Sequence, residues 1–351
     1  MMAAVPVSVI TGFLGSGKTT LLARLLRDPA LARTAVIVNE FGAVGLDHLL
    51  VEASDEDIVA LNSGCVCCTV RGDLVRTAGD LLARRAAGAV AAFERIVIET
   101  TGLADPAPIL HALMTDAMLA DTVCLESVIT TVDAAAGAAT LDAHPESVKQ
   151  AAVADRIVVT KTDLADPAGN GLADRLHALN PVAPQLTAVH GAVEASRLFG
   201  GRLYDPAARA PDVRRWLAAE ALPHDPPDRS RHNHDITSFC LRRGAPLHAV
   251  TLSLFLQVLA EHCGADLLRL KGLVDVRESP GRPAVIHGVQ HVFHPLAWLD
   301  AWPDGDRTTR IVVIARGLDP RWLEALLDAL DDEVAALHEA KSGKGEPCSI
   351  Y

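Results

Sequence analysis

Short apolar runs alternate with amphipathic stretches from the start of the chain to about residue 190. Apolar runs of four to eight residues predict buried strands, and apolar residues recurring every three to four positions predict helices. This alternation is the pattern of βαβ units around a parallel sheet. The predicted strands are Val5–Thr11, Ala35–Asn39, Arg95–Glu99, Ser127–Val132, Arg156–Thr160 and Gln185–Val189, and the predicted helices are Lys18–Leu26, Asp73–Arg85, Pro106–Met114, Val148–Ala154 and Leu172–Leu179.

The pattern changes after residue 205, where prolines, charges and histidines interrupt the apolar periodicity. Such a stretch is typical of a linker. A second set of elements follows it: strands Ile236–Leu241, Leu268–Val276, Ala284–Gln290 and Ile311–Ala315, and helices Ala249–His262 and Pro320–His338. The sequence therefore predicts an α/β domain over 1–205, a linker over 206–235, a smaller α+β domain over 236–341 and a tail over 342–351.

Composition narrows the classes of function. The chain has 351 residues, enough for two domains, and its 32 basic against 44 acidic residues give a net charge of −12. This charge argues against a nucleic-acid-binding protein. No apolar stretch approaches the roughly 20 residues that span a bilayer, and the N-terminus lacks a basic leader. We therefore expect a cytoplasmic protein without a membrane partner, whose seven cysteines are reduced thiols.

A phosphate-binding motif follows the first predicted strand. Gly12 and Gly17 frame the pattern Gly-x4-Gly-Lys-Thr, and a predicted helix begins at Lys18. Glycines let successive backbone N–H groups face a phosphate, and the helix N-terminus adds partial positive charge. Lys18 can reach the β- and γ-phosphates, and the Thr19 hydroxyl can bind Mg²⁺. The first domain is therefore predicted to be a P-loop NTPase domain with a mainly parallel sheet.

Two further segments fit a nucleotide site. The apolar strand 95–99 ends in Glu99, where P-loop enzymes place an acid that binds Mg²⁺ through water or orients the attacking water, and the Gly102 N–H can sense the γ-phosphate. A carboxylate placed like Asp163 can accept hydrogen bonds from guanine N1–H and N2–H₂, and Lys161 can pack over the ring. The usual motif of GTPases is Asn-Lys-x-Asp, and Thr160 replaces the asparagine that normally braces this loop.

Three cysteines, Cys65, Cys67 and Cys68, lie within four positions between the phosphate loop and Glu99. Two or three thiolates can converge on one ion, and Zn²⁺ would then need one or two further ligands. Thiolates suit Zn²⁺ or Cu(I), and Co²⁺ and Ni²⁺ also bind such sites, so the ligands do not fix the metal. Buried apolar cysteines and a redox pair are the alternatives.

Other polar groups are weaker candidates. Glu40 follows the second strand, where it could reach Mg²⁺, the attacking water or a thiol-bound metal, although a capped turn with solvated carboxylates explains the segment as well. His232 and His234 lie in the linker, where a solvated role is the default.

Three histidines also occur within the predicted strand 284–290 and just after it. In a continuous strand His287 and His291 would share one face and His294 the other. Packing within the second domain is the default interpretation.

Taken together, the segments GFLGSGKTT, NEFGAVGLD, SGCVCCTVRGDL, ETTGLADPAP and TKTD resemble, in order and spacing, the CobW-like GTPases. These are relatives of the nickel-insertion GTPases of urease and hydrogenase maturation. The resemblance extends to the second domain and implies GTP-dependent binding and delivery of a metal, usually Zn²⁺ or Co²⁺. By motif position it assigns phosphate binding to Gly12, Gly15, Ser16, Gly17, Lys18, Thr19 and Thr20, Mg²⁺ to Thr19, guanine to Lys161 and Asp163, and the metal to Cys65, Cys67 and Cys68.

The chain departs from the family in two places. Many members carry a second glutamate in the switch segment, where this chain has Ala43, and many have a long histidine-rich linker. The first departure argues against an accessory carboxylate site, and the second against high-capacity metal storage.

The sequence thus predicts a GTP-hydrolysing metallochaperone with Lys18, Glu99 and Glu40 as its catalytic residues. Neither a glutamine nor an arginine finger is evident, so turnover should be slow unless a partner or self-association as a homodimer raises it. The expected partner is a client metalloprotein. The alternatives are a metal-buffering, zinc-binding protein with a structural nucleotide site and a small-molecule kinase that uses the second domain as a lid.

Overall fold

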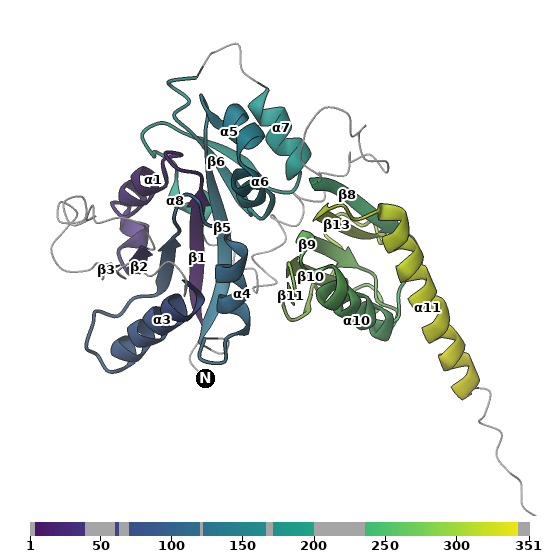
Figure 1. Ribbon diagram of the computed structural model, residues 1–351. Coiled ribbons are helices and arrows are strands. Elements are labelled where there is room, and N and C mark those ends of the chain that lie inside the picture. The colour runs from purple at the N-terminus through teal and green to yellow at the C-terminus, as the bar shows by residue number, and fades with distance from the viewer. Residues whose placement is uncertain are drawn as a thin grey trace, which may run out of the picture. The chain divides into compact units, whose positions relative to one another are not determined.

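Parallel strands form the core of the first half of the chain (Figure 1). The computed structural model describes residues 4–38, 60–62, 70–119, 122–165, 171–199 and 236–342. The chain divides into two compact units, whose described parts are those before residue 200 and those after residue 235. The predicted linker, 206–235, lies outside the described residues.

The described strands of the first unit make one sheet in the order β3-β2-β4-β1-β5-β6-β7, and every neighbouring pair is parallel. The strands are β1 (Val5–Gly12), β2 (Thr34–Val38), β3 (Ala60–Asn62), β4 (Arg95–Glu99), β5 (Val123–Asp133), β6 (Arg156–Thr160) and β7 (Gln185–Ala188). The helices are α1 (Lys18–Leu25), the 3₁₀ turn η1 (Pro29–Leu31), α3 (Val70–Ala86), α4 (Ala107–Thr115), α5 (Gly137–Ala143), α6 (Pro145–Ala152), α7 (Leu172–Leu179) and α8 (Ala195–Leu198).

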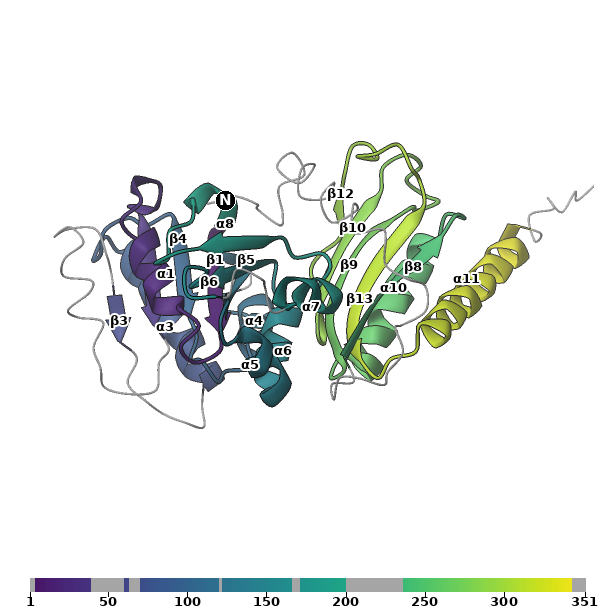
Figure 2. The ribbon, with the colours of Figure 1, turned by 90° about the horizontal axis from the view of Figure 1, so that it is seen from above.

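Helices lie on both sides of this sheet (Figure 2). Leucines of α1 and α8 pack with alternate residues of the strands, such as Ile10 of β1 and Val158 of β6, in one apolar cluster. Helices α4 and α6 contact β5, while α3 packs against α4 and α7 against α6. All residues of β1 and β2 are therefore buried, which explains why these strands read as continuous apolar runs.

The second unit is built on an antiparallel sheet of the order β11-β10-β9-β13-β8, with β12 paired to β10. Its strands are β8 (Ile236–Arg243), β9 (Leu267–Val274), β10 (Ala284–Val289), β11 (Val292–Phe293), β12 (Ala297–Trp298) and β13 (Thr309–Arg316). Its helices are α10 (Ala249–Val258), which continues as one π-helical turn, η2 (Leu259–Cys263), and α11 (Pro320–Ser342). Both α10 and α11 cover the same face of the sheet (Figure 2), where Phe255 and Leu323 join its main apolar cluster.

The predicted fold class, a P-loop-type parallel α/β domain followed by a smaller α+β domain, is confirmed. The strands 95–99 and 156–160 and the helix 172–179 have the predicted bounds. Several short elements were not predicted, namely η1, β3, α5, α8, β11 and β12. Helix α5 is the clearest case, because its sequence Gly-Ala-Ala-Thr carries little amphipathic signal and the helix is held by the packing of Leu141, which is 1% exposed.

The predicted strand Ala284–Gln290 is confirmed as β10 except for its last residue, but the arrangement of the histidines around it was not predicted. The chain reverses direction after Val289, because Gln290 adopts a positive φ of 51° and β10 pairs with β11 as a tight hairpin. His287 and His294 consequently lie together, with ring centroids 6.3 Å apart, instead of on opposite faces. His291 is exposed at the turn, where its Nδ1 lies 2.8 Å from the carbonyl oxygen of Ala260.

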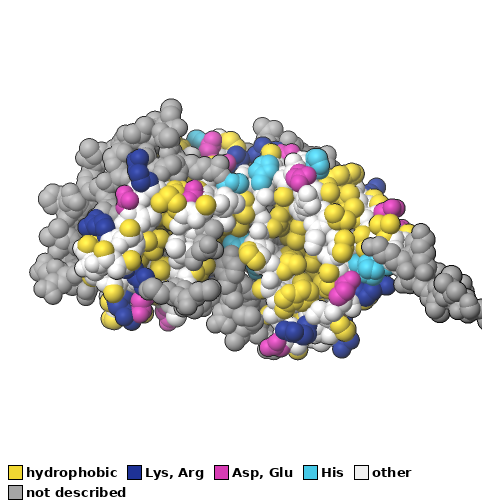
Figure 3. Space-filling model, turned by 90° about the horizontal axis from the view of Figure 1, so that it is seen from below, with side chains coloured by type: hydrophobic (Ala, Val, Ile, Leu, Met, Phe, Trp, Pro, Cys, Tyr) yellow, Lys and Arg dark blue, Asp and Glu magenta, His cyan; other side chains and the backbone are white. Residues whose placement is uncertain are grey.

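On the face drawn in Figure 3, basic and acidic side chains are interspersed rather than gathered by sign. Among the described helices, none combines the length and the apolar character needed to cross a bilayer.

Candidate nucleotide site

The loop between β1 and α1 has the backbone that phosphate binding requires. Gly12 has a φ of 140°, and a Cβ at this position would lie 2.4 Å from the carbonyl oxygen of Thr131 on β5, so only glycine fits. Gly15 and Gly17 also have positive φ, 71° and 91°. The loop is braced from β5 by a hydrogen bond of 2.6 Å between the hydroxyls of Ser16 and Thr131.

Lys18 begins α1, and its side chain folds back over the loop. Its Nζ donates to the carbonyl oxygens of Gly12 at 2.9 Å and Phe13 at 3.1 Å, and the residue is 8% exposed. This places the ammonium group within the curve of the loop, where an anionic phosphate oxygen would meet it. Thr20, by contrast, is exposed on α1.

The two predicted Mg²⁺ groups meet across the sheet. Thr19 Oγ1 donates a hydrogen bond of 2.6 Å to Oε1 of Glu99, although the residues are 80 positions apart. Parallel pairing of β1 with β4 causes this contact, because it brings the carboxyl ends of the two strands to the same edge. Glu99 is 3% exposed. A hydroxyl and a carboxylate are hard oxygen donors, so this pair fits Mg²⁺.

The turn after Glu99 lies directly against the phosphate loop. A Cβ on Gly102 would lie 2.7 Å from the backbone nitrogen and Cα of Leu14, so glycine allows the two backbones to touch. Thr100 fixes the start of the turn, since its backbone N–H donates to Ile10 and its hydroxyl to the hydroxyl of Thr11 at 2.9 Å. The sequence predicted a γ-phosphate sensor at Gly102, and the backbone is close enough to the loop for that role.

The base-recognition segment is braced by a residue that the sequence made doubtful. Thr160 Oγ1 donates to the carbonyl oxygen of Ser16 at 2.7 Å and to that of Val132 at 3.3 Å, so its hydroxyl links this segment to the phosphate loop. Thr160 therefore supplies the brace for which an asparagine amide is usual. This contact was not predicted, because the motif indicated only that the amide was missing.

Lys161 is held in place by an ion pair. It has a φ of 54°, and its Nζ donates to Oδ2 of Asp133 at 2.7 Å. Burial by itself would raise the pKa of Asp133, but the hydrogen bonds from Lys161 and from the N–H groups of Ala136 and Ala135 outweigh it and hold that pKa below its ordinary value. Asp163 is exposed beyond Lys161, accessible to a base.

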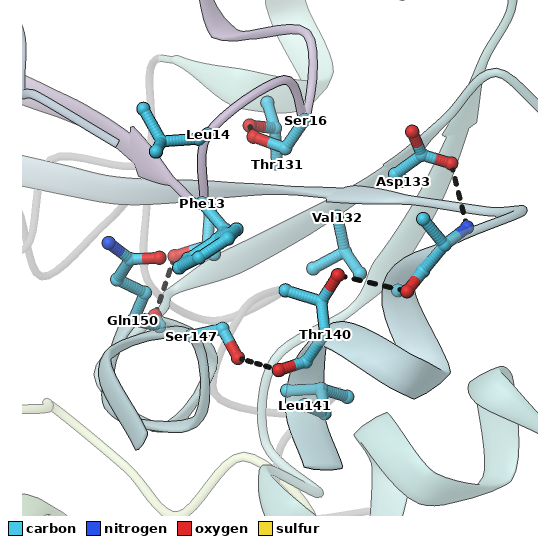
Figure 4. A pocket seen from close by; sticks show the side chains of 13 residues that line it. Phe13, Leu14, Ser16, Thr131, Val132, Asp133, Thr140, Leu141, Ser147 and Gln150 are labelled. Atoms are coloured by element: carbon cyan, nitrogen blue, oxygen red, sulfur yellow. Dashed lines mark hydrogen bonds between the residues drawn. The ribbon is translucent and has the colours of Figure 1, made fainter. Parts of the chain in front are cut away.

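A small pocket of about 40 Å³ lies beside the phosphate loop (Figure 4). Phe13, Val132 and Leu141 give it an apolar lining, and Gln150 of α6 closes it at the end where Phe13 lies. The ring of Phe13 stacks on that of His144, with ring centroids 4.3 Å apart. The start of α6 thus touches the loop.

The predicted metal ligands Cys65, Cys67 and Cys68, the predicted catalytic Glu40 and the linker histidines His232 and His234 lie outside the described residues. Within the described residues, no group of three His, Cys, Asp or Glu side chains is arranged to hold a metal ion. Burial raises the pKa of the Cys240 and Cys263 thiols, so their reactive thiolate forms are disfavoured.

The described elements that flank the cysteine segment in the sequence are β3 and α3. β3 ends at Asn62, three residues before Cys65, and α3 begins at Val70, two residues after Cys68. β3 is parallel to β2, β4 and β1, so Asn62 lies at the same edge as Glu99 and the phosphate loop.

These features define a P-loop nucleotide-binding protein with a second α+β domain. The model of the CobW/HypB/UreG nucleotide-binding domain matches residues 6–187, and that of the cobalamin synthesis protein cobW C-terminal domain matches residues 236–331. The chain belongs to the CobW/HypB/UreG family.

Relatives match over nearly the whole length. The chain is 31% identical to the zinc chaperone YjiA of Escherichia coli, over 94% of this chain and 99% of that protein. It is 33% identical to the zinc chaperone CobW of Pseudomonas aeruginosa, over 91% of this chain and 89% of that protein. Its structure is similar to the crystal structure of the Zn(II)-bound YjiA GTPase from E. coli, with a TM-score of 0.68 and 26% identity over 94% of this chain and 99% of that one.

Proposed function

We propose that this chain is a GTP-hydrolysing metallochaperone, which couples its nucleotide state to the binding and delivery of a divalent transition metal, zinc or cobalt, to a client protein. One observation carries the proposal: the Thr19–Glu99 pair and Lys18 lie at the carboxyl ends of the parallel strands. The strand that precedes the cysteine segment in the sequence, β3, ends at this same edge. The zinc-chaperone relatives support the choice of zinc as the first metal to test.

Each group at this edge has a role in hydrolysis. Lys18 binds the β- and γ-phosphates and stabilises the charge that develops as the γ-phosphate leaves. Thr19 and Glu99 hold Mg²⁺, which neutralises phosphate charge when it is bound. Glu99 and Glu40 are the candidates for orienting the attacking water. Guanine is recognised by Asp163, with Lys161 held over the ring by Asp133.

The metal is the cargo of this cycle. Cys65, Cys67 and Cys68 provide soft thiolates, which suit Zn²⁺ and also bind Co²⁺. When GTP and Mg²⁺ order the segments of Glu40 and Glu99, the cysteine segment closes around the metal, and hydrolysis of GTP removes the γ-phosphate contacts and loosens the metal for a client metalloprotein. We place the protein in the cytoplasm, where free thiols stay reduced, and expect self-association as a homodimer or a partner to accelerate its slow turnover.

An anaerobic competition titration tests the coupling. Reduced protein is titrated with Zn²⁺ and, separately, Co²⁺ against a chromophoric chelator, once with GDP and once with a non-hydrolysable GTP analogue plus Mg²⁺. We expect tighter metal binding with the analogue. The gain should disappear when Cys65, Cys67 and Cys68 are all replaced by serine, but not in the control Cys124→Ser, whose half-buried thiol lies near the start of β5.

Equal metal affinity in both nucleotide states would contradict the coupling. Such a result, together with a failure to hydrolyse GTP, would favour a metal-buffering protein with a structural nucleotide site. Phosphate transfer to an acceptor other than water would instead indicate a small-molecule kinase.

A further inference from the structure

Helix α6 holds the turn that follows Glu99 by means of a buried amide. Gln150 is 0% exposed, and its Nε2 donates hydrogen bonds to the carbonyl oxygens of Gly102 at 3.2 Å and Ala104 at 2.9 Å. Both acceptors are carbonyl oxygens, so the side-chain group that faces them must be the NH₂ end of the amide. Both N–H groups of this amide therefore donate to one turn, which lies 46–48 positions away in the sequence.

The neighbouring residue of α6 holds the next part of the same turn. Lys149 Nζ lies 2.8 Å from Oδ2 of Asp105, and Oδ1 of Asp105 accepts the backbone N–H of Ala107 at the start of α4 at 3.0 Å. The segment from Gly102 to Asp105 is thus attached to α6 at three points. The Lys149–Asp105 pair is partly exposed, so the buried Gln150 is the stronger attachment.

α6 is itself anchored to the strand beneath the phosphate loop. The hydroxyl of Thr130 on β5 donates to the carbonyl oxygen of Gln150 at 2.7 Å. On the other side of Gly102, Thr100 is tied to β1 through Ile10 and Thr11. Gly102 is therefore held from both sides while its Cα rests against Leu14 of the phosphate loop.

We infer that Gln150 is a positioning residue for GTP hydrolysis, which fixes the Gly102 turn against the phosphate loop so that the Gly102 N–H meets the γ-phosphate. This inference rests on the proposed GTPase function. GDP has no γ-phosphate. Gln150 should therefore affect the binding and hydrolysis of GTP but not the binding of GDP. A purely structural amide would affect both nucleotides alike.

The test compares Gln150→Met, which keeps the length of the side chain and removes both donors, with the wild-type full-length chain. We expect kcat for GTP hydrolysis to fall between about tenfold and a hundredfold, because the turn loses its fixed position. The affinity for GDP should stay within about twofold, and the affinity for a non-hydrolysable GTP analogue with Mg²⁺ should fall by about tenfold, the cost of a lost hydrogen bond to a charged group.

The chain offers a matched control in Asn180, which follows α7 and holds the other end of α6. Asn180 is also 0% exposed, and its Nδ2 donates to the carbonyl oxygens of Ala151, Ala152 and Ala154 at the far end of α6. Asn180→Leu should lower the melting temperature as much as Gln150→Met while leaving kcat and the ratio of analogue to GDP affinity unchanged. Gln150→Glu adds a pH readout, since a protonated carboxyl donates one hydrogen bond: its kcat relative to wild type should rise as the pH is lowered.

The outcomes separate this inference from the proposed function. If wild-type protein does not hydrolyse GTP, the proposed function fails, yet a fall in the affinity ratio confined to Gln150→Met still supports the positioning role. If Gln150→Met retains both kcat and the affinity ratio, or if Asn180→Leu loses them to the same degree, Gln150 is a structural residue and the inference is overturned.

Discussion

The two sheets of this chain use their polar residues differently, and strand direction explains much of the difference. In the parallel sheet all strands end at one edge, so the phosphate loop after β1, Glu99 at the end of β4 and Lys161 after β6 gather there from distant parts of the sequence. In the antiparallel sheet successive strand ends alternate between two edges.

Polar residues of the second unit join local networks that hold its elements together. Asp331 of α11 accepts hydrogen bonds from Arg243 of β8 and from Thr251 and the backbone N–H of His248 at the start of α10. Arg310 of β13, 2% exposed, forms a bidentate pair with Asp304. The buried charges of this network hold elements of the second unit together, whereas Lys18 and Glu99 lie at the edge where we propose that GTP is hydrolysed, and substitutions should separate the two roles.

The largest effect is expected from Asp331→Ala. This change leaves Arg243 without its more buried carboxylate partner and removes an acceptor at the N-terminus of α10, and it should lower the free energy of unfolding of the second unit by roughly 3–5 kcal/mol. Three of the four tryptophans, Trp298, Trp302 and Trp322, belong to this unit, so urea unfolding followed by tryptophan fluorescence measures the loss.

The control for this change is Asp328→Asn, at the other carboxylate that pairs with Arg243. Its side chain is 63% exposed, so the cost should be at most about 1 kcal/mol. GTP hydrolysis by folded Asp331→Ala at low temperature should match wild type. Equal losses for the two variants would mean that burial of the carboxylate does not decide the strength of this network.

At the carboxyl ends of the parallel strands we expect the opposite, a loss of activity without a loss of stability in the second unit. Lys18→Met should lower kcat/KM for GTP hydrolysis by about 10²–10³-fold, since one preorganised donor to the phosphates is lost. The steady-state release of phosphate measures it, and urea unfolding of the second unit should be unchanged. Retention of hydrolysis within tenfold of wild type would remove Lys18 from the proposed machinery.

The same contrast explains how far the sequence alone predicts this molecule. Motifs predicted the phosphate loop, Glu99 and the Lys161 segment, because their chemistry requires fixed residue types next to a strand end. Contacts that depend on distant packing were not predictable: Gln150 lies almost fifty positions from the turn it holds, and no local pattern connects them. From the sequence, Thr160 indicated only that the bracing asparagine was missing, and the hydrogen bond from its hydroxyl to Ser16 could be seen only in the structure.

The hairpin at Gln290 was missed for a related reason. Tight two-residue turns with positive φ favour glycine, asparagine or aspartate, and Gln290-His291 carries none of these signals. The turn is imposed instead by pairing on either side of it, Val289 with Val292 and Gly288 with Phe293. Gly288 admits the Phe293 ring, which a Cβ would meet at 2.5 Å. The histidine arrangement that follows from the hairpin could not be predicted from strand alternation.

The smallest effect we expect is an acid-induced loss of stability in the second unit. Hydrogen bonds from Arg310 lower the pKa of Asp304 below its ordinary value of 3.8, and they outweigh the burial that would raise it. The folded state thus favours the ionised carboxylate. Its contribution, about 1–2 kcal/mol for a charge-assisted pair, is fully present above pH 3.8 and is lost as the pH falls through the lower pKa of the folded state.

Asp304→Asn should remove this contribution at neutral pH and flatten the dependence of stability on pH below about 4. Urea unfolding at a series of pH values, followed by tryptophan fluorescence, measures both effects. Trp302 is a nearby probe, since its ring lies 5.9 Å from Arg310. The matched control is Asp133→Asn in the first unit. The pKa of Asp133 is also lowered, and its partner Lys161 has a side chain 38% exposed to water. Because Asp133 belongs to the first unit, this variant should leave the acid dependence of the second unit intact. A pH profile of Asp304→Asn identical to that of wild type would show that Arg310 is held without Asp304, and the contrast between the two units would then rest on Asp331 alone.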